Sequence, residues 1–126
     1  MKKKVIFTLI FFLYFIFLIV IIAVPGVGDF IPENVAMVKG FDKIVHFFEF
    51  LILTLILARA VDFYELKHKL LKNKFLIIVV IAVFIAVISE LIQIPIPRRE
   101  FSLLDLGADA LGILAGVIVK WKFSKQ

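Results

Sequence analysis

The sequence predicts an all-α integral membrane protein, built as a bundle of four transmembrane helices with both termini in the cytoplasm. Three observations support this fold class. The 126 residues are 63% hydrophobic, whereas soluble domains are about half apolar. The apolar residues form four long blocks that carry few charges, as membrane-spanning helices do. Most of the 15 Lys and Arg residues flank the same end of these blocks.

The four blocks span residues 5–24, 44–61, 75–94 and 103–119. Each is about as long as a helix needs to cross a ~30 Å hydrocarbon core at ~1.5 Å per residue. The first block follows three lysines, but its apolar run is longer than the ~7–15 residues usual in a signal peptide. No A-x-A-like cleavage site follows it, so we interpret it as an uncleaved span. Residues 1–126 are predicted to form a single transmembrane domain.

The segments between the blocks carry strong turn signals. Residues 25–41 contain two prolines and three glycines, which argues against one regular helix. Pro95 and Pro97 end the third block and predict a tight hairpin to the fourth. Within the fourth block, Ala108, Gly112 and Gly116 recur every four residues, a spacing that allows two helices to approach closely.

The basic residues set the predicted orientation. Eleven of the 15 Lys and Arg residues lie at the end of the blocks where both chain termini fall. Cytoplasmic segments of membrane proteins collect Lys and Arg, so this end is predicted to face the cytoplasm. Because these residues flank spans rather than form one basic face, we expect no nucleic-acid partner. The absence of cysteine excludes disulfides and thiolate chemistry.

Ten polar residues gather at the predicted outer ends of the last three blocks: Asp42, Lys43, His46, Glu49, Glu90, Gln93, Arg98, Arg99, Asp105 and Asp109. Asp42, His46 and Glu49 follow helical spacing and share one face. Counted from the outer ends, Glu49, Glu90 and Asp109 lie roughly 6–10 Å deep. Ionisable residues are costly inside a bilayer and are therefore functional candidates. We expect these side chains to converge in one outward-facing binding pocket.

Structural roles compete with this interpretation at several positions. Asp42 is placed to act as the N-cap of the second block. Ser102 and Asp105 match a capping box at the start of the fourth block. Arg98 and Arg99 also fit solvated turn residues. Glu49, Glu90 and Asp109 lie too far inside the blocks for capping, which leaves structural ion pairs as their alternative role.

These motifs resemble the VanZ-like membrane family. The family's D-K-x-x-H-F motif matches residues 42–47, its E-x-x-Q matches residues 90–93, and its turn arginine matches Arg98 or Arg99. Its D-x-x-x-N-x-x-G-x-x-x-G motif matches residues 105–116, except that Asp109 replaces the usual Asn. The resemblance covers about residues 41–116. It implies a small, prokaryotic, multi-pass protein of the cell (cytoplasmic) membrane, related to a protein associated with resistance to a glycopeptide antibiotic.

The expected function is binding of an envelope-related anionic ligand, or an accessory role in the cell envelope, which is glycopeptide-resistance-like by resemblance. Arg98 and Arg99 would hold a phosphate or carboxylate of a lipid-linked or peptidoglycan-type ligand within the membrane lipid. The alternative is a membrane-embedded enzyme acting on a lipid-linked substrate. Its catalytic candidates are His46 as general acid or base, with Glu90 or Asp105 orienting it.

Two further possibilities are less favoured by the sequence. A proton or ion pathway would need charged residues through the inner half of the spans, but the polar layer is one-sided. Asp, Glu and His are residue types that bind divalent cations. Because the zinc motif H-E-x-x-H does not occur, the expectation is no metal and no other cofactor.

Overall fold

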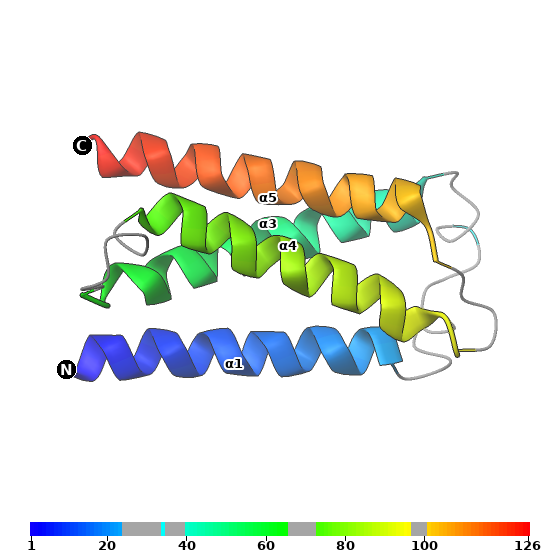
Figure 1. Cartoon of the computed structure of the whole chain (residues 1–126), viewed down its shortest axis with the longest axis horizontal. Helices are drawn as coiled ribbons and strands as arrows, with labels where there is room; N and C mark the ends of the chain where they lie inside the picture. Colours follow the sequence, from blue (N-terminus) through cyan, green and yellow to red (C-terminus); the bar gives the residue numbers. More distant parts are fainter. Residues whose placement is uncertain (24–33, 35–39, 66–72, 97–100) are drawn as a thin grey trace.

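The computed structural model describes residues 1–23, 34, 40–65, 73–96 and 101–126. These residues form four helices: α1 (Lys2–Ala23), α3 (Phe41–Asp62), α4 (Lys74–Gln93) and α5 (Leu103–Ser124). The helices run alternately in opposite directions, so that both termini lie at one end of the bundle (Figure 1). The predicted all-α class is confirmed. The helices extend past the apolar blocks at several ends because helical hydrogen bonding continues into the polar flanks.

Among the described helices, α1, α3 and α4 are long and apolar enough to cross a membrane. The fourth predicted span is not supported in the same way. Helix α5 is also 22 residues long, but Asp105, Asp109, Lys120 and Lys122 reduce its apolar character. Length and composition therefore support a multi-pass membrane protein with three such helices.

Large apolar side chains cover much of the outer surface of the bundle. Phe12, Leu13, Val80, Phe84 and Leu111 are each more than half exposed. Soluble monomers rarely expose apolar patches this extensive. A hydrocarbon environment removes their contact with water, which agrees with the apolar character of three helices.

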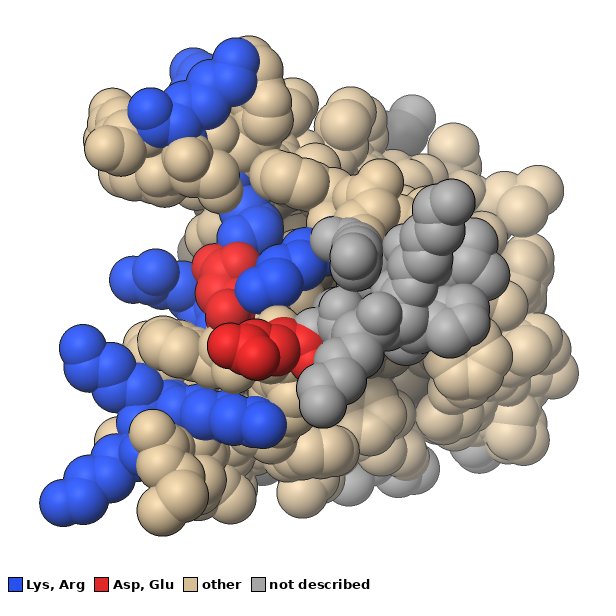
Figure 2. Space-filling view, turned by 60° about the vertical axis from the view of Figure 1, so that its left-hand side comes forward, with Lys and Arg blue, Asp and Glu red and all other residues tan. Residues whose placement is uncertain are grey.

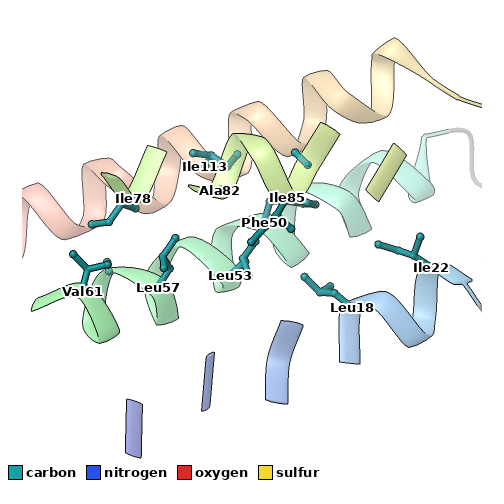
Figure 3. Close-up of a cluster of buried hydrophobic side chains, with 12 residues drawn as sticks. Leu18, Ile22, Phe50, Leu53, Leu57, Val61, Ile78, Ala82, Ile85 and Ile113 are labelled. Carbon is teal, nitrogen blue, oxygen red and sulfur yellow. The ribbon is translucent and has the colours of Figure 1, made fainter. Parts of the chain in front are cut away.

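Helices α3 and α4 each contact the other three described helices, and α3 makes the more extensive contacts. The core side chains come from all four helices and meet around α3 (Figure 3). The largest of them include Leu18, Phe50, Leu53, Ile78 and Ile113. The core thus packs α3 against the other three described helices.

The small residues of α5 pack against α3, as their spacing predicted. A Cβ atom on Gly112 would collide with the backbone carbonyl oxygen of Phe47 and stand 3.0 Å from the backbone nitrogen of Leu51. A Cβ atom on Gly116 would stand 2.7 Å from the Cβ of Thr54. This seam makes α3 and α5 the most extensive helix pair of the described bundle.

The end of the bundle that holds both termini is basic (Figure 2). Its described basic residues are Lys2, Lys3, Lys4, Arg59, Lys74, Lys120, Lys122 and Lys125. The Lys120 ammonium lies 2.6 Å from an Asp62 carboxylate oxygen, and Lys4 lies 4.0 Å from the ring centroid of Tyr64. At the opposite end, Lys43 is the one described lysine or arginine. The charge asymmetry used to predict orientation is therefore present in three dimensions.

Candidate functional site

The end opposite the termini brings together polar residues from three helices. It is formed by the start of α3, the end of α4 and the start of α5 (Figure 1). His46, Glu90 and Asp109, here called the buried triad, each offer a ligand atom within 4.8 Å of the other two. Glu90 and Asp109 are fully buried, and the His46 side chain is 13% exposed. The predicted convergence of these three helices therefore occurs inside the bundle.

His46 and Asp109 form the closest pair of the triad. His46 Nδ1 lies 2.9 Å from Asp109 Oδ1. The residue after His46 is Phe47, whose carbonyl faces Gly112, and Asp109 lies one turn before that glycine. The close approach of α3 and α5 thus sets the distance between the two side chains. The second carboxylate oxygen, Asp109 Oδ2, is buried and has no hydrogen-bond partner within the described part of the chain.

Glu90 connects the end of α4 to the start of α5. Its Oε1 accepts a hydrogen bond from Gln93 Nε2 at 3.2 Å, and its Oε2 accepts one from the backbone N–H of Ser102 at 3.1 Å. Both donors are neutral. A buried carboxylate is tolerated only when its oxygens accept hydrogen bonds. Glu90 meets this condition, because each of its two oxygens accepts one.

The capping box predicted at Ser102 is half correct. The Ser102 hydroxyl accepts a hydrogen bond from the backbone N–H of Asp105 at 3.2 Å, as an N-cap does. In a full capping box, the acid three residues later binds the N–H of the cap residue. Here Glu90 of α4 takes that N–H instead. The Asp105 carboxylate consequently remains available to another helix.

Lys43 joins α3 to α5 at the rim of the site. Its ammonium lies 3.0 Å from Asp105 Oδ1 and 2.6 Å from Asp42 Oδ2. The proposed N-cap role of Asp42 is wrong, because Gly40 holds that position with a φ of 87° and Asp42 lies in the first turn. Solvent screens an ion pair formed by an exposed lysine, so these contacts add little to the stability of the bundle.

Other predicted site residues take different places. Glu49 is half-buried but lies outside the triad, and its backbone carbonyl accepts a hydrogen bond from the Tyr14 hydroxyl at 3.0 Å. Of the two residues of α3 that the sequence places near Glu90 and Asp109, His46 joins them in the triad and Glu49 does not. Arg98 and Arg99 lie outside the described residues.

The hydrogen bond between Ser102 and Glu90 was not predicted from the sequence. Ser102 was identified only as a cap, yet its backbone N–H supports the buried glutamate. Backbone donors carry no sequence signal, because every residue except proline has one. Only the turn signal at Pro95 and Pro97, which brings α4 and α5 into a hairpin, pointed toward this contact.

Comparison with known proteins finds no match among family models, curated proteins or solved structures. The arrangement itself must therefore indicate the chemistry. Two buried carboxylates and one imidazole, supplied by three packed helices, are groups that can bind a proton or a cation. Lys43, the described lysine at this end, holds its ammonium between the carboxylates of Asp42 and Asp105.

Proposed function

We propose that the chain is a four-span, VanZ-like protein of the prokaryotic cell membrane, with a binding site for an anionic envelope ligand in its outer leaflet. The buried triad is the observation that carries this proposal. Membrane proteins rarely retain fully buried acids in apolar helices unless the acids serve a substrate, ion or ligand. The VanZ-like assignment is supported by the ordered motifs of residues 41–116.

The fourth span is proposed from the way α5 packs. The acids that reduce its apolar character are turned inward, since Asp109 is fully buried and Asp105 is 9% exposed. Its exposed residues include Leu104, Leu111 and Ile118. A helix of 22 residues is about 33 Å long, enough to cross the bilayer beside α3. We infer that α5 spans the membrane with its apolar face toward lipid.

The orientation is proposed from the charges at the two ends. The basic end holds both termini, and basic segments remain in the cytoplasm. The buried triad then lies near the outer surface, where envelope lipids and peptidoglycan precursors are handled.

We expect a cysteine at position 34 to react with a membrane-impermeant maleimide in intact cells, and one at position 69 to react only after lysis. The chain has no native cysteine, so Asn34→Cys and Lys69→Cys give unambiguous single sites. Equal expression of both variants is the control. Labelling of position 69 in intact cells would reverse the topology and place the triad on the cytoplasmic side.

The ligand is proposed to be a phosphate or carboxylate of a lipid-linked or peptidoglycan-type molecule. Arg98 and Arg99, in the part of the sequence that adjoins this end of the bundle, support an anion. An accessory role in the envelope follows from such binding. Because Glu90 and Asp109 would repel an anion, their charge must be offset when the ligand enters.

His46→Gln and Glu90→Gln are expected to abolish the envelope phenotype of the protein, measured by complementation of a deletion strain under cell-wall antibiotics. Both replacements keep hydrogen-bonding groups for Asp109 and Ser102, so membrane abundance should stay near wild type. Ser89→Ala is the matched control, because Ser89 is buried beside Glu90 and its hydroxyl donates to the Ala86 carbonyl of its own helix. Complementation by both site variants at normal abundance would exclude the triad as the working site.

A membrane-embedded enzyme is the second candidate. The contact between His46 Nδ1 and Asp109 favours it, because a carboxylate at one ring nitrogen fixes the tautomer of a general acid or base. The orienting acid is then Asp109 rather than the expected Glu90 or Asp105. Chemical change of a lipid-linked pyrophosphate by the purified protein, followed by mass spectrometry, separates this function from binding alone.

A further inference from the structure

Among the described residues, little positive charge lies near the buried triad. Glu90 accepts hydrogen bonds from neutral donors, and the ammonium of Lys43 is engaged with Asp42 and Asp105. Within the described part of the chain, the His46 imidazole is the only group able to offer a positive charge to the two buried carboxylates. Uncompensated charge in an apolar interior costs several kcal/mol per ion, so a cation bound between the two acids would stabilise this arrangement.

The second observation is Asp109 Oδ2. This oxygen is buried without a hydrogen-bond partner among the described residues, although nearly all buried polar atoms in proteins have one. Its sister oxygen and His46 Nδ1 are 2.9 Å apart. Two ligands of one zinc ion, each ~2.0–2.1 Å from the metal, stand about 3.4 Å apart. The 2.9 Å contact is a hydrogen bond, so a metal ion at this pair would take the place of its proton and set the two atoms slightly further apart.

We propose that the buried triad binds a divalent transition-metal ion, Zn²⁺ or Mn²⁺, through His46, Glu90 and Asp109. One imidazole nitrogen and two carboxylate oxygens suit these ions. Their atoms lie within 4.8 Å of one another, so small side-chain rotations bring all three to one ion. Two positive charges then balance two carboxylates. Supply of the ligands by three packed helices makes the site rigid.

The ion also gives the proposed function a means to bind an anion. Three protein ligands leave a coordination position open, as in zinc sites that accept a water or substrate. A phosphate or carboxylate at that position meets a metal ion instead of two bare carboxylates. This role rests on the proposed function, whereas metal binding itself does not, so each is tested separately.

The test is metal content of the full-length protein, purified in detergent with a tag that contains no histidine. The protein is stripped with chelator, loaded with ZnCl2 or MnCl2, desalted and analysed by inductively coupled plasma mass spectrometry. We expect the wild type to retain a stoichiometric ion. Glu90→Gln and Asp109→Asn should weaken binding by more than the roughly 10–100-fold lost with a supporting residue.

The chain offers a matched control for the imidazole, because it has two histidines, His46 and His68. His46→Gln should lose the ion and His68→Gln should keep it. Asp105→Asn, which neutralises an acid one turn earlier on α5, should also keep it. Loss of the ion from His68→Gln or Asp105→Asn to the same degree as from Asp109→Asn would overturn the assignment of the ligands.

A second readout avoids dependence on the folding of variants. Wild-type protein loaded with Co²⁺ should show the visible absorption of a four- or five-coordinate ion with nitrogen and oxygen ligands. A spectrum like that of the hydrated ion, or wild-type zinc and manganese content no higher than buffer, would overturn the proposal. These measurements need no envelope ligand. The proposal of a metal site and the proposal of an envelope role can therefore be disproved independently.

Discussion

Gly112→Ala is expected to destabilise the bundle by about 1–3 kcal/mol, the usual cost of overpacking a core. The value should lie toward the upper end, because the added methyl would collide with the Phe47 carbonyl oxygen and approach the Leu51 nitrogen. Both are backbone atoms, so relief requires that α3 and α5 move apart. The change is measured as the loss of folded protein in mixed detergent micelles as the fraction of SDS rises.

Gly107→Ala is the matched control on the same helix. A Cβ atom at Gly107 meets nothing within 4 Å, and alanine exceeds glycine in helix propensity by about 1 kcal/mol. This variant should be neutral or more stable. Equal destabilisation by both substitutions would show that the cost arises from α5 itself rather than from its contact with α3. Because the seam also positions Asp109, Gly112→Ala should weaken metal binding as well.

His46→Leu is expected to destabilise the metal-free protein by about 3–5 kcal/mol, the cost of leaving a buried charge without its partner. His46 is the described hydrogen-bond partner of the Asp109 carboxylate, and leucine cannot replace it. The same SDS titration measures the effect. The loss should exceed that of His46→Gln, which retains a donor for the carboxylate.

A double-mutant cycle isolates the pair. In an Asp109→Asn background, His46→Leu should cost less, because a neutral amide without a partner is less unfavourable than a carboxylate. A coupling energy of about 0.5–3 kcal/mol is typical of residues in direct contact. If His46→Leu lowers the free energy of unfolding equally in both backgrounds, the imidazole stabilises the bundle by packing alone. The contact with Asp109 then contributes nothing to stability.

The sequence alone predicted the helices and the gathering of polar residues at the end of the bundle opposite the termini. Apolar blocks of about membrane thickness can satisfy their backbone hydrogen bonds only as helices, so block and helix coincide except at their polar flanks. Helical spacing also placed the glycines of α5 on one face, and that face meets α3. The apolar character of α5 was less clear, because composition counts Asp105 and Asp109 without regard to the direction in which they point.

Only the tertiary structure decided which polar residues meet. Helical periodicity places His46 and Glu49 on the same broad face of α3, but it does not say which neighbouring helix each residue approaches. The α3–α5 seam brings His46 to Asp109, while Glu49 lies where the Tyr14 hydroxyl of α1 reaches its carbonyl. The N–H of Ser102 likewise goes to Glu90 rather than to Asp105. These choices depend on distances between helices, which packing sets and local sequence does not encode.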